Sequence, residues 1–241
     1  MAFKKHWVIT LKKLNRALAD VRAELDKSGF WNPRLANIGV YLTWFGSAYG
    51  WQHYRRSGDI EITAFSLCRL CEAIPGSESV PLRDIVRHEY AHAIADSNRG
   101  LMRSSQFHRA FGKHHDSDSP SVYSPDMHVS KYAAEDAGED FAEVSMCYLK
   151  YSGKLPHHLD TPAIRKKWGF VSQLCSQIQS GKRRWAPEIS MSKLTDIYLP
   201  VLEQAQRLGL GAPCIVKTWS DWSQETLFPV GKPRESLFSK L

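Results

Sequence analysis

Two histidines four residues apart limit most strongly what this chain can fold into. His88 and His92 enclose Glu89 in the sequence HEYAH. On an α-helix, residues four apart lie on one face, so both imidazoles can reach the same point. Such a pair can bind Zn²⁺, and the Glu89 carboxylate can then take a proton from a water at the metal. The stretch therefore predicts a zinc site on a helix; a core helix whose histidines only form hydrogen bonds is the alternative.

The residues around these histidines favour a buried helix. Pro81 suits the first turn of a helix, and apolar residues such as Ile85 and Ile94 recur beyond it at helical spacing. We expect the helix to end near residues 96–98, before a glycine. Asp96 lies four residues after His92 on the same face, where it could accept a hydrogen bond from that histidine or simply close the helix.

A pair of acidic residues supplies the candidate third ligand. Glu139 and Glu143 lie four residues apart in a segment with helical spacing. Two carboxylates on one face are costly to bury unpaired, and a zinc ion with two histidines would supply the missing charge. Glu139 can bind the metal, and Glu143 can orient a ligand histidine. An exposed acidic face is the alternative, and His108, His114 and His115 are alternative ligands.

Two segments before the histidines favour β-strands. Residues 37–45 are rich in β-branched and aromatic side chains, and residues 59–65 alternate between apolar and polar ones. If residues 59–65 form a sheet edge, an extended peptide could add there as a further strand. The polar segment 114–126 contains two prolines and predicts a long loop. Helices are predicted over residues 9–28, 104–112, 162–179 and 190–208.

Composition favours an ordinary globular protein. Of 241 residues, 43% are hydrophobic and 24% charged. No apolar run is long enough to span a membrane, and the N-terminus lacks the pattern of a signal peptide. We expect a cytoplasmic protein with no membrane partner, although an effector delivered into another cell could also lack a cleavable signal. The five scattered cysteines favour reduced thiols, and Cys68 and Cys71 form a lone CxxC that is weak support for a metal.

The net charge of +7 is unevenly distributed. Residues 100–149 contain eight acidic and four basic residues, whereas residues 150–241 contain seven acidic and fourteen basic ones. A basic flank can contact nucleic acid or an acidic partner. The cluster Lys182-Arg183-Arg184-Trp185 is the best candidate for that contact, and a solvated charged surface is the alternative.

A family resemblance rests on three short segments. HEYAH, Tyr132-Ala133 and Glu139-Asp140-Phe141-Ala142-Glu143 together resemble the gluzincin-type zinc metallopeptidases of the anthrax lethal factor and Mlc titration factor type. The shared pattern joins HExxH to a downstream E-D-F-A helix, with a tyrosine seven residues before its first glutamate. The resemblance covers residues 59–150 at most. It implies an α+β fold with a small mixed sheet and an active-site helix.

The resemblance also implies a role for each matched residue. His88, His92 and Glu139 would bind one Zn²⁺ per chain. Glu89 would act as general base and then as general acid. Tyr132 would donate a hydrogen bond to the oxygen that becomes negative in the transition state, and Glu143 would support a ligand histidine. The expected function is zinc-dependent hydrolysis of peptide bonds in a protein or peptide substrate.

We therefore expect a zincin-like metallopeptidase domain over residues 1–185 and a basic, mostly helical, aromatic extension over residues 186–241. Three alternatives stay open. The chain also resembles, more weakly, the SprT-type DNA-associated proteases, whose third ligand is a histidine. A non-catalytic interaction protein stabilised by zinc would have a closed site with four ligands. A latent protease would fill its own cleft with the 114–126 loop or the aromatic tail.

Overall fold

The structure is a computed structural model that describes residues 9, 11–32, 35, 38–46, 50–54, 57–66, 80–182 and 214–216. The chain divides into two compact units. The first unit comprises Met1–Asn15, Ala36–Ser79 and Pro187–Leu241, and the second comprises Arg16–Leu35 and Val80–Ala186. The described residues are mostly helical. None of the helices among them is long and apolar enough to cross a lipid bilayer.

Several predicted features lie outside the described residues. They are the Cys68 and Cys71 pair, the 190–208 helix and the basic cluster beyond Lys182. Of the predicted extension over residues 186–241, the structure describes only Cys214–Val216. The division into a 1–185 domain and an extension therefore stays a prediction.

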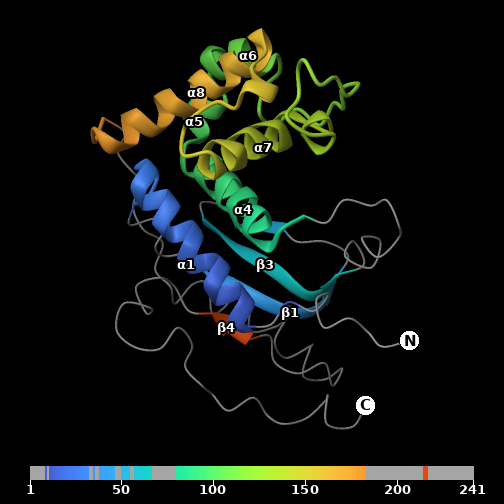
Figure 1. Ribbon diagram of the computed structural model, residues 1–241, viewed down its shortest axis with the longest axis vertical. Coiled ribbons are helices and arrows are strands. Elements are labelled where there is room, and N and C mark those ends of the chain that lie inside the picture. The colour runs from blue at the N-terminus through green and yellow to red at the C-terminus, as the bar shows by residue number, and fades with distance from the viewer. Residues whose placement is uncertain are drawn as a thin grey trace. The chain divides into compact units, whose positions relative to one another are not determined.

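The strands of the first unit form a four-stranded sheet in the order β2-β3-β1-β4 (Figure 1). β1 (Val40–Gly46) runs parallel to β3 (Ser57–Ser66). β2 (Gly50–Tyr54) pairs antiparallel with β3, and β4 (Cys214–Val216) pairs antiparallel with β1. β1 and β3 correspond to the predicted strands over residues 37–45 and 59–65, whereas β2 and β4 were not predicted.

β3 lies between β1 and β2, so the prediction that residues 59–65 form a sheet edge for an added peptide is wrong for residues 59–61, which pair with β2. No described strand pairs with residues 62–65 on that side. β3 has β1 on one side and β2 on the other. Ile60, for example, lies opposite Val40 of β1 and opposite Trp51 of β2. Alternating side chains predict the two faces of a strand, but they carry no information about which strands will lie beside it.

α1 (Leu11–Ser28) confirms the helix predicted over residues 9–28. Its apolar stripe is buried, with Leu14, Leu18, Val21 and Leu25 each at 0% exposure. The helix ends at Gly29, whose φ of +84° lies in the left-handed region. A Cβ at Gly29 would also meet the Gln179 side chain at 1.9 Å. Glycine at this position therefore lets the end of another helix approach closely.

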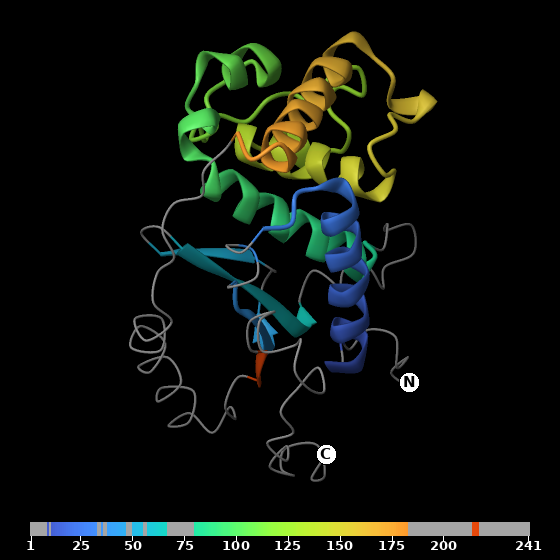
Figure 2. The ribbon, with the colours of Figure 1, turned by 90° about the vertical axis from the view of Figure 1, so that its left-hand side faces the viewer.

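The second unit continues with helices around α4 (Leu82–Ser97) and α7 (Ala137–Lys150), which pack against each other. α5 (Arg99–Met102) and α6 (Ser105–Phe111) follow α4, and residues 112–131 form a loop before the 3₁₀ turn η1 (Tyr132–Ala134). After η2 (His157–Leu159), α8 (Pro162–Gln179) lies beside α7 in both views (Figures 1 and 2). The predictions of a 104–112 helix, a loop over 114–126 and a 162–179 helix are confirmed.

An aromatic cluster holds α6, α7 and α8 together. Phe107 and Phe111 stack with ring centroids 4.4 Å apart. Phe170 of α8 meets Phe107 edge-on at 5.4 Å, and Phe141 of α7 lies 5.9 Å from Phe111. These rings are buried and form an aromatic core between α6, α7 and α8.

Candidate metal centre

α4 carries the two histidines of the HEYAH sequence at its centre. Val86, Tyr90 and Ile94 are fully buried and fix one face of the helix in the core. His88 is 8% exposed, and His92 is partly exposed on the same face. The two Nε2 atoms lie 3.0 Å apart, as expected for residues four apart on a helix.

α7 brings a carboxylate to the same place. Asp136 caps the helix, because its side chain accepts a hydrogen bond from the Glu139 backbone N–H at 2.8 Å. The Glu139 Oε2 atom lies 2.9 Å from the His88 Nε2 atom and 3.4 Å from the His92 Nε2 atom. The three residues form a group whose candidate ligand atoms all lie within 4.8 Å of one another.

The donor set fits a zinc ion. Tetrahedral ligands at Zn²⁺ bond lengths of about 2.0–2.2 Å lie about 3.3–3.6 Å from one another. The separation of 3.4 Å observed here lies in that range, and those of 3.0 and 2.9 Å are slightly shorter. The buried Oε2 atom of Glu139 makes no hydrogen bond of good geometry with a described residue, although two imidazole nitrogens are near it. Two imidazole nitrogens and a carboxylate oxygen that converge on one point are typical of metal ligands.

Glu143 orients His88 from the other side of its ring. The Glu143 Oε1 atom lies 2.7 Å from the His88 Nδ1 atom, and both residues are buried. A proton on Nδ1, donated to this carboxylate, leaves the Nε2 lone pair directed at the proposed metal position. Without a metal, burial lowers the pKa of His88, but the carboxylates of Glu139 and Glu143 outweigh burial and raise it to about 10, so a metal ion would have to displace the proton from Nε2. Conversely, burial raises the pKa of Glu139, yet the two histidines hold it well below its usual range.

Glu89 and Tyr132 lie close to this group. Glu89 is 5% exposed, and its negative charge acts on both His88 and Tyr132. The Tyr132 ring lies in η1, 45% exposed, with its centroid 5.6 Å from that of His88. Burial of the phenol and the nearby Glu139 carboxylate raise the pKa of Tyr132 above its usual range. Tyr132 therefore keeps its proton and can donate a hydrogen bond.

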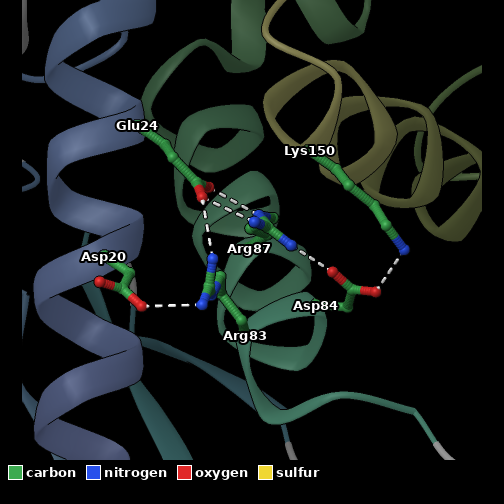
Figure 3. Close-up of polar contacts among 6 residues, drawn as sticks. All are labelled: Asp20, Glu24, Arg83, Asp84, Arg87 and Lys150. Carbon is green, nitrogen blue, oxygen red and sulfur yellow. Dashed lines mark hydrogen bonds and ion pairs between the residues drawn. The ribbon is translucent and has the colours of Figure 1, made fainter.

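Charged side chains fix α4 between α1 and α7 (Figure 3). The buried Arg87 guanidinium makes two hydrogen bonds of 2.6 Å to the Glu24 carboxylate and a third to Asp84. Lys150 at the end of α7 bonds the other Asp84 oxygen at 2.7 Å. Arg83, one turn earlier on α4, pairs with Asp20 at 2.9 Å on the surface. Residues next to the candidate ligands are thus held by two neighbouring helices.

Polar contacts join α4 and α7 at three levels. Asp84 meets Lys150 at 2.7 Å, and His88 meets Glu143 at 2.7 Å. The third contact joins His92 to Glu139 at 3.4 Å. Positions rise along α4 as they fall along α7, so the two helices run antiparallel. The candidate metal position lies at one end of this series.

The remaining predicted residues lie elsewhere. Asp96 forms an ion pair with Arg99 at 2.6 Å, and its predicted hydrogen bond to His92 stays a prediction. His108 and His114 are exposed, with ring centroids 5.0 Å apart, and His115 packs on Phe107. Within the described part of the chain, none of these three histidines joins the group of candidate ligands.

The sequence predicted that Glu143 supports the site, but it did not predict the other supporting residues. Asp136 could have been recognised, since an aspartate three residues before a glutamate is a common start of a helix. Arg87 and Lys150 carry no such signal, because lysine and arginine are usually exposed and their partners here are distant in sequence.

No protein-family model, curated protein or solved structure matches this chain. The proposed function therefore rests on the residues of the chain itself. They define a candidate metal centre with two imidazoles, one carboxylate, an adjacent buried glutamate and a tyrosine at the rim.

Proposed function

We propose that this chain is a zinc-dependent peptidase with a zincin-like α+β fold. The convergence of His88, His92 and Glu139, with Glu89 next to the first histidine on α4, is the observation that carries the proposal. A four-stranded sheet with both parallel and antiparallel pairs supports the fold class. The separations within the ligand group fit a tetrahedral zinc site.

In this mechanism, His88, His92 and Glu139 would hold a Zn²⁺ ion, which would supply a Lewis acid that lowers the pKa of water toward neutrality. Glu89 takes a proton from the attacking water and returns it to the leaving amine nitrogen. Tyr132 donates its phenolic hydrogen to the carbonyl oxygen as that oxygen becomes negative. Glu143 keeps the His88 ring in one orientation through its Nδ1 atom.

The rival functions require other ligands. A purely structural zinc needs a fourth protein ligand, and a SprT-type site needs a third histidine. Among the described residues, the ligand group contains three members, and its third member is Glu139. A zinc ion with only three protein ligands would keep a position open for water. These observations favour a catalytic centre over a closed one, and nucleic-acid binding by the basic flank stays a prediction.

Zinc content provides the first test of the site. Elemental analysis is made on the wild type, on Glu139→Ala and on a triple alanine variant of His108, His114 and His115. We expect one zinc per chain in the wild type and the triple variant, and a loss in Glu139→Ala. Zinc that persists without Glu139 but is lost from the triple variant would overturn the ligand assignment.

Turnover provides the test of the chemistry. The wild type, loaded with zinc, is incubated with a mixed peptide library, and products are read by mass spectrometry. We expect Glu89→Gln to retain its zinc but to lose at least about a thousandfold in kcat, because the amide cannot take a proton from water. Asp118→Asn, which changes an exposed acid in the 112–131 loop, is the control. Unchanged turnover in Glu89→Gln would rule out the mechanism.

A further inference from the structure

Two consecutive carbonyl groups in the turn before Tyr132 are held by side chains of the α8 segment. The Thr161 Oγ1 atom donates to the Asp126 carbonyl oxygen at 2.6 Å. The Lys167 Nζ atom donates to the carbonyl oxygen of Met127. The turn closes on itself through bonds from the backbone N–H groups of residues 127 and 128 to the Ser124 carbonyl, at 3.0 and 2.8 Å. Side chains at the start of α8 and within it therefore hold this mostly exposed turn through its backbone carbonyl groups.

Lys167 is an unusual residue to find in this place. It is 3% exposed and forms an ion pair of 2.5 Å with Asp140 of α7, which is 4% exposed. A buried ion pair seldom adds more stability than a pair of apolar side chains of the same size. The Oδ1 atom of Asp140 also lacks a hydrogen-bond partner among the described residues, which adds a cost. Stability alone does not account for the pair, and the same Lys167 ammonium also donates to the Met127 carbonyl.

The ion pair ties the turn to the helix that carries a candidate ligand. Asp140 directly follows Glu139, and successive residues of a helix point about 100° apart. Glu139 is thus directed at the two histidines, while Asp140 is directed at Lys167. Through Lys167, the turn takes its position from the same backbone that positions the ligand.

The turn 124–128 is also connected to Tyr132. Tyr132 lies four residues after His128, the last residue of the turn, which is 5% exposed. The Ser130 hydroxyl accepts a hydrogen bond from the Ala133 N–H at 3.1 Å, which fixes the start of η1. On the other side of the turn, the Ser121 N–H donates to the Ala134 carbonyl at 2.7 Å. A shift of the turn would therefore move η1 and the tyrosine it carries.

We infer that Lys167, together with Asp140, is a positioning residue that sets the turn 124–128 so that Tyr132 stands beside His88. This inference rests on the proposed function, in which Tyr132 stabilises the transition state. It assigns a role to α8, which lies outside the HEYAH and EDFAE segments. Lys167 touches neither substrate nor metal and acts only through the backbone it holds.

The first experiment compares Lys167→Met with Lys166→Met in the full chain loaded with zinc. Methionine keeps an unbranched apolar stem and removes the donor, and Lys166 is an exposed neighbour on the same helix. We expect Lys167→Met to lose at least about tenfold in kcat, with KM within about twofold and one zinc retained, because only a transition-state contact is disturbed. Lys166→Met should match the wild type. Equal kcat in the two variants would overturn the inference.

A double variant separates positioning from folding. Lys167→Met alone leaves Asp140 buried without its partner and can reduce the population of folded protein. Lys167→Met with Asp140→Asn removes that uncompensated charge, and its thermal unfolding should return close to that of the wild type. We expect its kcat to stay low, since the Met127 carbonyl is still not held. Recovery of the full kcat in this stable double variant would overturn the inference.

Coupling to Tyr132 gives a more specific readout. If Lys167 acts through the tyrosine, then Lys167→Met should reduce kcat by less than about twofold in a Tyr132→Phe background. If the two losses multiply instead, Lys167 acts independently of Tyr132, and the inference is wrong.

Amide hydrogen exchange tests the positioning without any activity. The N–H groups of His128 and Ala134 are bonded in the native turn and in η1, to the Ser124 and Lys131 carbonyls. We expect both to exchange at least about tenfold faster in Lys167→Met than in Lys166→Met. Equal exchange would overturn the inference. If the wild type cleaves no peptide, the proposed function fails, and exchange alone then decides whether Lys167 holds the turn.

Discussion

Single residues decide how firmly the candidate ligands are held. The Glu143 carboxylate meets the Nδ1 atom of His88 in a buried setting, where a lost hydrogen bond is not replaced by water. The ligand set itself would be intact without it. The contribution of Glu143 to metal affinity should therefore be separable from that of the three ligands.

We expect Glu143→Gln to bind zinc about ten- to a hundredfold more weakly than the wild type, since an amide is a poorer acceptor for the His88 N–H. The dissociation constant is measured by competition with a chromogenic chelator. Glu135→Gln, which changes an exposed acid, should leave it unaltered. Equal affinities for all three proteins would show that Glu143 does not support His88.

The thiol of Cys147 offers a prediction that depends on pH. Burial, and next the Glu143 charge, raise the pKa of Cys147 to about 12. Only the thiolate reacts with alkylating agents, so at about pH 8.5 the native thiol should react very slowly, whereas in urea it should react like an ordinary cysteine. Iodoacetamide labelling followed by peptide mapping measures this. Rapid labelling of the native chain at that pH would contradict the burial of Cys147.

At the scale of elements, α4 contains two arginines with the same type of partner but different surroundings (Figure 3). The Arg87 side chain is 6% exposed and bonds Glu24 and Asp84, whereas that of Arg83 is 47% exposed and pairs with Asp20. Loss of one partner from a buried network leaves charges without compensation, while water readily replaces a surface partner.

We expect Arg87→Met to reduce the free energy of unfolding by about 3 kcal/mol and Arg83→Met by less than about 1 kcal/mol. Urea unfolding followed by circular dichroism measures both. Similar losses in the two variants would mean that burial of the Arg87 network does not determine its strength.

Local signals explain which elements could be predicted from the sequence. The α8 helix has the predicted bounds, because Thr161 caps it, Pro162 opens it and apolar residues recur at helical spacing. Pro81 was expected inside the first turn of α4 and is its N-cap instead. β4 has three residues and pairs with β1, which lies far earlier in the chain. No local pattern identifies such a short strand or its neighbour.

The same limit applies to the candidate site. His88 and His92 follow from helical spacing within one element. That Glu139 meets them depends on how α4 and α7 pack, and the spacing of Glu139 and Glu143 made it a candidate ligand, which the resemblance also implied. Lys167 and Asp140 could not be predicted as a pair, because a lysine in a helix is ordinarily exposed and its partner lies in another helix.

For the whole molecule, zinc should act as a stabilising ligand. Its donors come from two helices that separate when the chain unfolds, so the ion should bind the folded state far better than the unfolded one. At free zinc of about a hundred times its dissociation constant, this stabilises the fold by about 2.7 kcal/mol. We expect a chelator to lower Tm, read by calorimetry, and excess zinc to restore it. Tm in Glu139→Ala should respond to neither; a full response there would contradict the ligand set.

The three polar contacts between α4 and α7 also penalise misassembly. If α7 shifted by one helical turn toward the N-terminal end of α4, Glu143 would face Asp84, and two buried carboxylates would repel each other. A shift by one turn toward the C-terminal end of α4 would place the Lys150 ammonium next to His88, where its positive charge would compete with the metal ion. Apolar contacts between helices tolerate such slips much better than charges do. The charges that surround the candidate metal position thus select one alignment of the helix pair, and only that alignment assembles all three ligands.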